Sequence, residues 1–540
     1  MKYYLLIIAF TSLLSACGKR SPTNVETGTA NQILHIGNSE EPREIDPQLS
    51  TGSPESNIHL ALYEGLTRKH PKTLEPTPGI AESWTISDDQ RIYTFTLRKD
   101  ALWSNGDHIT ADHIVWSFKR SLMPNLASEW AYMKYYIKNA EEFNTGKITN
   151  FSEVGVRTLD EHTVQFELNY PVDFFLQLLS HASYFPVHPP TILAHGPIDQ
   201  AISLWTRPKN WVGNGPFTLK TWTLNERIET TKNPNYWDAD NVLLNGVVFY
   251  PITDQQAEVR AFRSGQIHLS YSPTMAIEKV AHYKTNEPES LRIHPTYATY
   301  YYEFNTTKPP FDDVRVRRAL SLAVDRKAIV ERVSKSGEQP GYSLIPDDPD
   351  GFSPTQQFSY DIDKAKILLA DAGYPNGEGF PAVDILYNSQ DNHRKIALAI
   401  QQMLAVNLNI QVGLLNQEWK VYLNSRTNLE HDIARAGWIS DYLDPSNFVE
   451  ILLSNSGNNN TGWASSEYDT IIAELKKTSD REERFALFER ANKILSDEMP
   501  VIPIYLYSDV NLVSTEVKGW YDNVMHTHPY NRVYLEKAEK

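Results

Sequence analysis

Two spacings of apolar residues alternate along the chain, one typical of strands and one typical of helices. Residues 382–388 place Val383, Ile385 and Tyr387 at every second position, which predicts a strand with one buried face. In residues 394–407 the apolar side chains recur at intervals of three and four, which predicts a helix. Residues 409–415 return to the strand pattern. A strand, a helix and a strand in this order form a βαβ unit, so the region is expected to be α/β.

Polar residues that cap helices mark further elements. Asp313 precedes a helical apolar pattern and Asp325 precedes its continuation, so both are predicted N-caps. Residues 91–122 predict a strand, a turn and then a helix that begins near Thr110 or Asp112. No segment repeats with a fixed period. The 540 residues, with 41% hydrophobic content, are enough for two to four domains of about 150 residues each.

The N-terminus has the pattern of a secretory signal. One Lys precedes an apolar run over residues 3–14, which is shorter than the ~20 residues that a spanning helix needs. Cys17 is the single cysteine of the chain and follows Leu-Ser-Ala, an arrangement that resembles the bacterial lipobox. We therefore predict a signal peptide over residues 1–16 and a lipid on Cys17, followed by a flexible tether over residues 17–32. An ordinary signal peptide with an incidental cysteine is the alternative.

Composition and motifs exclude several kinds of chemistry. The 51 basic and 67 acidic residues form no basic stripe for phosphates, so no nucleic-acid partner is expected. The HExxH, CxxC, GxSxG and P-loop signatures are all missing. His526 and His528 form an HxH pair, but the sequence offers no evident third metal ligand. We expect no catalytic residues, no cofactor and no metal, with an enzyme whose active site is dispersed as the alternative.

One polar stretch combines three groups that suit a binding site. Residues 434–448 contain Arg435, Trp438 and Asp441 within seven residues, beside a glycine and a proline that favour turns. The composition is typical of a loop, and a solvated turn anchored by a buried Trp would explain it. A cation, an indole and an anion so close together also suit a ligand site.

Five stretches, in order along the chain, resemble the large substrate-binding lipoproteins of ABC importers, which take up peptides, nickel and related solutes. They are ALYEGLTR (61–68), GIAESW (79–84), YTFTLRKDALWSNGDHITADHIVWSFKR (93–120), NPNYWD (233–238) and FDDVRVRRALSLAVDR (311–326). The oligopeptide-binding members of this family are the most similar, through residues 299–317, 414–426, 434–442 and 452–461.

The resemblance implies an α/β fold, a two-lobed periplasmic-binding-protein clamp with an extra third domain. Lobe I would be discontinuous and consist of residues 33–63, 193–296 and 508–540. The extra domain II would cover residues 64–192, and lobe II (domain III) would cover residues 297–507.

The resemblance also implies where a peptide would bind. Asp441 would pair with the free α-amine of the peptide. Matching positions around the cleft are held by Trp130, Trp419, Trp438, Asn458 and Tyr507. Four cations would act as alternative partners of the peptide carboxylate, chosen by ligand length: Arg435, Arg426, Arg332 and His393. Thr51 stands where the family has a glutamate, which removes one anion near the amine end.

The function implied is that of a receptor rather than an enzyme. It would bind short peptides with little dependence on side chains and deliver them to an inner-membrane ABC permease with its ATPase subunits. It would act as a monomer in the periplasm, held to a membrane by the lipid. A receptor of the same fold for nickel or for murein peptides is the first alternative, and a periplasmic peptidase is the second.

Overall fold

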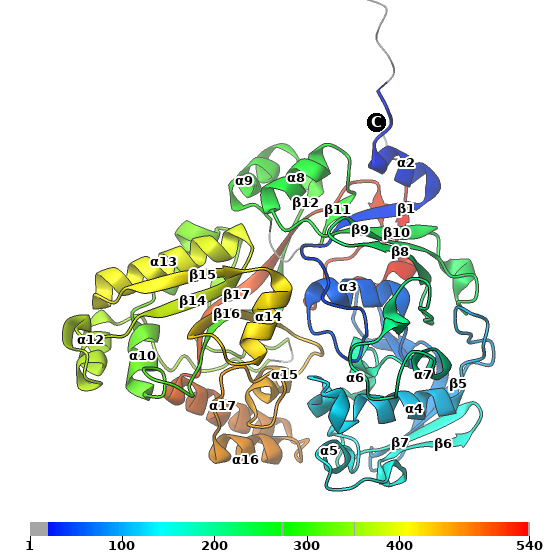
Figure 1. The fold of residues 1–540 in the computed structure, drawn as a ribbon, viewed down its shortest axis with the longest axis horizontal. Coiled ribbons are helices and arrows are strands. Elements are labelled where there is room, and N and C mark those ends of the chain that lie inside the picture. The colour runs from blue at the N-terminus through cyan, green and yellow to red at the C-terminus, as the bar shows by residue number, and fades with distance from the viewer. Residues whose placement is uncertain (1–19, 272–274, 350, 538–540) are drawn as a thin grey trace, which may run out of the picture.

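The computed structural model describes residues 20–271, 275–349 and 351–537 (Figure 1). The predicted signal peptide and the predicted lipid on Cys17 lie outside these residues. Three sheets of four or more strands organise the described chain, and each has its own hydrophobic core; two further sheets have two strands each. None of the helices in the described part is both long and apolar enough to cross a membrane.

The first body, called lobe I below, is built on a five-stranded mixed sheet. In spatial order its strands are β11 (Leu269–Ser270), β1 (Ile33–Gly37), β10 (Gly246–Tyr250), β9 (Arg227–Lys232) and β8 (Phe217–Thr223). β1 runs parallel to β10 and β11, whereas β9 pairs antiparallel with both of its neighbours. Helix α3 (Ser53–Leu62) contributes Ile58, Ala61 and Leu62 to the core of this lobe.

Lobe II is built on a six-stranded sheet. Its strands are β13 (Gln339–Pro340), β17 (Val501–Leu512), β12 (Leu291–Phe304), β16 (Ile433–Ile439), β14 (Val383–Asn388) and β15 (Val412–Gln417). Around it lie α10 (Val314–Leu322), α12 (Ile362–Asp371), α13 (Asp391–Leu408), α14 (Trp419–Thr427), α16 (Ser466–Leu475) and α17 (Arg481–Glu498) (Figure 1). β14, α13 and β15 form the predicted βαβ unit, since β14 and β15 pair in parallel. Asp313 and Asp325 cap their helices as predicted.

The third body, called the extra domain below, packs against both lobes. Four antiparallel strands form its sheet: β4 (Ala81–Ile86), β5 (Ile92–Leu97), β7 (Thr163–Glu167) and β6 (Val156–Asp160). Helix α4 (Ala111–Ser121) begins at the N-cap Thr110, as the sequence predicted. Phe118 of this helix packs on Phe166 of β7 with ring centroids 5.0 Å apart.

Two long strands pass between the lobes. β12 and β17 pair antiparallel along their length, with a register shift between Pro295 and Thr299. One end of β17 adjoins lobe I, where Val513 bridges to Leu269, and the other end lies inside the sheet of lobe II. The predicted borders at residues 296/297 and 507/508 fall within these strands, and the exact domain boundaries stay a prediction.

The segment expected to be a flexible tether is partly a helix. α2 (Asn24–Asn31) begins with a capping box in which the Thr23 hydroxyl accepts from the Glu26 amide and the Glu26 side chain accepts from the Thr23 amide. Gln32 then donates to the carbonyl of Leu535 over 2.6 Å, which fixes the start of β1 beside the C-terminal segment. The prediction of a flexible tether was wrong for residues 24–31, because the capping box and contacts with distant residues stabilise a helix there.

Candidate functional site

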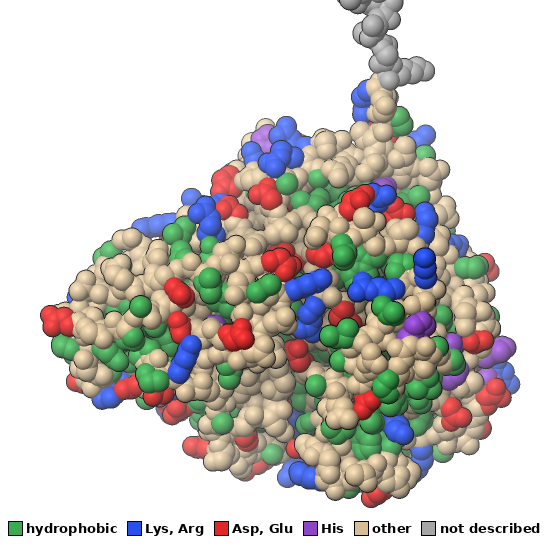
Figure 2. Space-filling model, in the orientation of Figure 1, with side chains coloured by type: hydrophobic (Ala, Val, Ile, Leu, Met, Phe, Trp, Pro, Cys, Tyr) green, Lys and Arg blue, Asp and Glu red, His purple; other side chains and the backbone are tan. Residues whose placement is uncertain are grey.

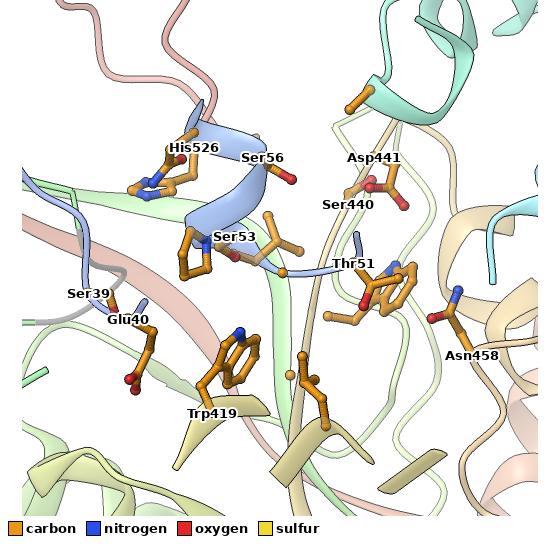
Figure 3. Close-up of a pocket in the computed structure, with 18 of the residues that line it drawn as sticks. Ser39, Glu40, Thr51, Ser53, Ser56, Trp419, Ser440, Asp441, Asn458 and His526 are labelled. Atoms are coloured by element: carbon orange, nitrogen blue, oxygen red, sulfur yellow. The ribbon is translucent and has the colours of Figure 1, made fainter. Parts of the chain in front are cut away.

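A cavity of about 230 Å³ lies between the two lobes and the extra domain (Figure 3). Nine of the ten residues expected at a peptide site line it: Trp130, His393, Trp419, Arg426, Arg435, Trp438, Asp441, Asn458 and Tyr507. Thr51, at the position where the family has a glutamate, also lines it. In Figure 3, Asp441 and Asn458 lie on one side of the cavity, with Thr51 beside them and Glu40 on the opposite side. The fold therefore gathers residues from positions 51 to 507 at one place.

Arg332 is the exception. It is exposed on the π-helical turn Ile329–Ser334 and is not part of the cavity lining. Ile329 and Val330 of the same turn are buried in the core of lobe II, so the backbone directs Arg332 to the surface instead. The expected carboxylate contact from Arg332 is therefore withdrawn.

Arg435 and Trp438 lie on a strand rather than in the expected loop. β16 pairs with β12 over its whole length, from Ile433 opposite Phe304 to Ile439 opposite Ala298. Its small residues have weak strand preference, which explains why the sequence favoured a loop. At Gly437, a Cβ would lie 2.6 Å from the Tyr507 hydroxyl and 3.3 Å from Arg435 Nη2. The glycine therefore leaves room for these two side chains to meet on one face of the strand.

Asp441 follows the end of β16 and is held by polar side chains from lobe II and the extra domain. Asn447 Nδ2 donates to Asp441 Oδ2 over 3.2 Å, and the Asp441 amide donates to Asn447 Oδ1 over 3.1 Å. His181 Nε2, from the extra domain, lies 3.1 Å from Oδ1. Lys69 donates to the backbone carbonyl of Asp441 over 3.0 Å, and burial lowers the pKa of Lys69 to about 8, with Asp441 opposing that shift. The carboxylate is thus oriented at the cavity wall.

Aromatic rings form the wall beside Asp441. The rings of Trp438 and Trp130 are 6.0 Å apart, and Trp130 meets His181 edge-on at 4.8 Å. Each indole is fixed by its N–H, which donates to Asn447 Oδ1 over 2.7 Å from Trp438 and to the Ser50 carbonyl over 2.8 Å from Trp130. Rigid, fixed rings offer apolar contact area without loss of side-chain entropy on binding.

The two arginines of lobe II have different surroundings. Arg426 forms a bidentate pair with buried Glu303, with Nε–Oε1 at 2.6 Å and Nη2–Oε2 at 2.9 Å. Arg435 has no carboxylate within 4.0 Å among the described residues; its Nη2 donates to the Tyr507 hydroxyl over 2.6 Å, and its guanidinium lies 4.7 Å from the ring centre of Tyr300. Arg426 is therefore neutralised within the protein, whereas Arg435 presents a positive charge to the cavity.

His393 is not a cation at neutral pH. Its Nδ1 lies 3.2 Å from the Tyr300 hydroxyl, and its side chain is buried. Burial, and then the neighbouring Arg435, hold the pKa of His393 well below its ordinary value. The neutral ring can serve as a hydrogen-bonding group, but it does not add a charge.

One edge of β16 is free where it borders the cavity. β14 pairs with β16 only at Ile433 and Ala434, and among the described strands none pairs with that side beyond Ala434. Gly437, Trp438, Ile439 and Ser440 all line the cavity. An extended ligand can therefore hydrogen-bond to the backbone of this strand, as an added strand would.

Polar contacts between the bodies close the cavity. Gln390 of lobe II donates to Ser39 of lobe I over 2.8 Å, and Asn388 donates to Glu40 over 3.3 Å. On the other side, Leu443 of lobe II donates through its amide to Gln177 of the extra domain over 3.0 Å. In Figure 2, acidic and basic side chains both lie near the middle of the face where the bodies meet.

Several residues of this site carry no signal in the sequence. Glu303, His181 and Asn447 decide how Arg426 and Asp441 are held, yet none of them stands out in its local sequence. Glu40 and Glu129 also line the cavity, and burial raises the pKa of both carboxyl groups, that of Glu40 to about 7. Acidic groups are therefore present although Thr51 replaces the family glutamate.

The chain belongs to a family of solute-binding proteins. Residues 75–460 match the family model described as "Bacterial extracellular solute-binding proteins, family 5 Middle". This membership agrees with the two-lobed α/β architecture and with a cavity between the lobes.

Several characterised proteins are similar over nearly the whole chain. The periplasmic oligopeptide-binding protein OppA of Escherichia coli (strain K12) is 38% identical over 515 residues, which cover 94% of this chain and 93% of OppA. The crystal structure of Haemophilus influenzae OppA in complex with RPPGFSPFR is 33% identical, with a TM-score of 0.89, and covers 94% of this chain and 99% of that chain. The expected fold class is confirmed.

The conformation is closer to a peptide complex than to an open form. The unliganded open form of MppA, a periplasmic murein tripeptide-binding protein, is also 33% identical, yet its TM-score is 0.62, with 94% of this chain and 97% of that chain covered. Equal identity with a lower score indicates a different arrangement of the lobes. Together with the contacts across the cavity, this describes a closed clamp.

Proposed function

We propose that the protein is an extracytoplasmic receptor for short peptides with free ends, and that it delivers them to an ABC importer. One observation carries the proposal: an oriented carboxylate, Asp441, and a guanidinium without an anionic partner, Arg435, face the same enclosed cavity. A zwitterionic peptide supplies the opposite charge at each end. Similarity to OppA proteins, one of them bound to RPPGFSPFR, supports the same substrate class.

Charge pairing explains why both ends of the ligand must be free. An ammonium group enclosed in a protein costs several kcal/mol of free energy unless an anion pairs with it. Asp441 supplies that anion, and Trp438 and Trp130 exclude water beside it. Arg435 does the same for the carboxylate, with Tyr507 holding the guanidinium in place.

The distance between the two charges sets the preferred ligand length. Six positions of extended chain separate Arg435 from Asp441, which corresponds to at most about 20 Å. The long Arg435 side chain reaches toward the ligand, so extended peptides of about three to five residues suit the gap. Arg426 and His393 line the cavity as further polar contacts for the carboxyl end, but Glu303 neutralises the first and burial the second.

Recognition of the peptide backbone would make binding largely independent of side chains. The free edge of β16 offers backbone amides and carbonyls at regular spacing to any extended peptide. Trp419, Trp438, Trp130 and Asn458 surround that edge with flat and amide groups that tolerate different side chains. Water molecules can fill the space that small side chains leave.

The transport role includes the parts of the chain outside the described residues. A signal peptide would direct the protein to the periplasm, and a lipid on Cys17 would hold it at a membrane as a monomer. The closed, loaded clamp would then dock on a permease whose ATPase subunits supply the energy. Binding needs no covalent chemistry, and Ser183, whose Oγ lies 2.9 Å from His181 Nδ1, is fully buried.

Direct identification of the ligand tests this function. The protein is purified without denaturation, and native mass spectrometry measures the masses that leave with mild activation. Peptides of about three to five residues with free ends are expected. Co-purified murein peptides would favour the MppA-like alternative, and cleavage of added peptides would favour the peptidase. The proposal would be contradicted if calorimetry detected no binding of short peptides with free ends.

A further inference from the structure

A second cluster of ionisable side chains lies beside the ligand cavity, at the strands that join the lobes. Asp509 belongs to β17 and His294 to β12, whereas His526 and His528 come from the segment after β18 (Val517–Lys518). His526 Nδ1 lies 2.7 Å from Asp509 Oδ2, and His294 Nε2 lies 3.0 Å from the same oxygen. Figure 3 places His526 at the edge of the cavity, away from Asp441.

The cluster is buried and incompletely hydrogen-bonded. Asp509, His526 and His528 are exposed by only 2%, 7% and 3%. Among the described residues, Asp509 Oδ1, His526 Nε2 and both ring nitrogens of His528 have no hydrogen-bond partner. The backbone of Tyr521 lies near the His528 ring without forming a regular hydrogen bond. Buried polar atoms are nearly always satisfied, so several such atoms in one place call for a ligand.

We infer that Asp509, His526 and His528 form a binding site for a divalent transition-metal ion, Zn²⁺ above all. One ligand atom of each residue lies within 4.8 Å of the others. Zinc bonds to imidazole nitrogen and carboxylate oxygen measure about 2.0–2.2 Å, so donors in a tetrahedron lie about 3.4 Å apart. Small side-chain movements bring the three donors to that spacing, and His294, whose Nε2 lies 3.0 Å from Asp509 Oδ2, would hold the carboxylate from outside.

The donor types suit a metal. Two imidazoles and one carboxylate are the donor types of zinc sites with an open position.

The loop that carries both histidines is organised in advance. Asn523 Oδ1 accepts from the amides of Met525 and Thr527, both over 3.2 Å, and the Tyr271 hydroxyl donates to the His526 carbonyl over 3.0 Å. His526 adopts a left-handed backbone with φ of 48°, an uncommon conformation that clusters at functional positions. His528 stacks on Trp520 with ring centroids 4.0 Å apart. These contacts hold the donors together before a metal arrives.

This site is distinct from the peptide contacts at Asp441 and Arg435. The metal would bind as a resident ion that ties the C-terminal segment to β17, one of the two strands that pass between the lobes. It would therefore stabilise the hinge region, and a peptide would not need to displace it. Metal binding at this site does not depend on peptide binding.

Zinc titration of the untagged, chelator-treated protein tests the site. A competing chromophoric chelator reports the affinity, and Co²⁺ reports the geometry through its visible d–d absorption. Wild type should take up one equivalent of Zn²⁺, and Co²⁺ should give the strong bands of a four- or five-coordinate ion. His528→Gln and His526→Gln should each weaken binding at least tenfold. His282→Gln, which removes an exposed histidine on α9 (Ile277–Asn286), should bind like wild type.

Two further measurements keep the test decisive. If the buried variants fold poorly, Zn²⁺ should still raise the melting temperature of wild type and of His282→Gln. Excess tetra-alanine should not release the metal, whereas a metal cargo competing for the cavity would be displaced. The inference would be overturned if wild type bound no stoichiometric Zn²⁺. It would also be overturned if the His526 and His528 variants kept the wild-type affinity and cobalt spectrum.

Discussion

The two ends of the cavity differ in how the charges of their side chains are compensated by neighbouring groups. At one end, Asp441 is held by a side-chain amide and a histidine, Asn447 and His181, so its negative charge is oriented but only partly compensated. At the other end, Arg426 is neutralised by Glu303, and Arg435 beside it meets only tyrosines. Burial of charged groups is costly, so a ligand that pairs with both Asp441 and Arg435 recovers part of that cost.

This difference separates structural ion pairs from binding groups. Arg426 and Arg435 have the same side chain, line the same cavity and stand nine positions apart in the sequence. Their internal partners distinguish them, because Glu303 is opposite one and absent from the other. The sequence analysis predicted four alternative cations for the peptide carboxylate, and we now expect Arg435 to be its main partner.

Removal of the anion at the amine end should have the largest effect. Asp441→Asn preserves the shape and the contact with Asn447 but leaves the peptide ammonium without its anion. Loss of one partner of a buried charge pair costs about 2–5 kcal/mol, so affinity for tetra-alanine should fall roughly thirtyfold to several thousandfold. Isothermal calorimetry measures the change. Wild-type affinity in this variant would remove Asp441 from the site.

The paired and unpaired arginines should respond in opposite ways. Arg435→Gln should weaken peptide binding by about 10- to 150-fold, which corresponds to about 1.5–3 kcal/mol for hydrogen bonds to a charged group, with little loss of stability. Arg426→Gln leaves Glu303 buried without a cation, so the free energy of unfolding of this variant should drop by about 3–5 kcal/mol while affinity changes less. Urea unfolding measures the stability of both variants, and calorimetry measures their affinity for the peptide. If both variants lost the same affinity and the same stability, the two arginines would not differ in role.

Glu40 allows a pH test at the contact between the lobes. Burial raises its pKa from the ordinary 4.5 to about 7, against hydrogen bonds from Asn388 and Thr253. Between these values the folded chain binds more protons at Glu40 than the unfolded chain, so stability should fall as pH rises from about 5 to 7.5, by at most about 3 kcal/mol. Glu40→Gln should flatten that part of the profile. An unchanged slope in the variant would place the pKa of Glu40 near its ordinary value.

The smallest effect is expected from the residue that positions Asp441. Asn447→Ala removes the hydrogen bonds to the Asp441 side chain and amide and to the Trp438 indole. Each such bond contributes about 1 kcal/mol, and rearrangement recovers part of it, so affinity should fall about fivefold to tenfold. Asn424→Ala, on the exposed side of α14, is the matched control and should leave affinity unchanged. An Asn447 loss as large as that of Asp441→Asn would mean that Asn447 itself binds the peptide.

The sequence was informative where the chemistry is local. Asp441, Trp438 and Arg435 fall within one short stretch, so a single motif located one wall of the cavity. It failed for partners from distant segments, because Glu303 and His181 acquire meaning only when the fold brings them to Arg426 and Asp441. The prediction that Arg332 contacts the peptide was wrong for another reason. Ile329 and Val330 occupy the core-facing side of the turn, so the Arg332 side chain points to the surface. For His526 and His528 the sequence shows no third metal ligand, because Asp509 of β17 comes near them only in the folded chain.

A cross of ligand and protein changes shows whether Asp441 binds the amine end of the peptide and Arg435 binds the carboxyl end. Tetra-alanine, its N-acetyl form and its C-terminal amide are titrated calorimetrically into wild type, Asp441→Asn and Arg435→Gln. Acetylation should lose most of its cost only in Asp441→Asn, and amidation should lose its cost only in Arg435→Gln, because each pair shares one contact. Equal costs of acetylation and of amidation in all three proteins would contradict the assignment of Asp441 and Arg435 to the two ends of the peptide.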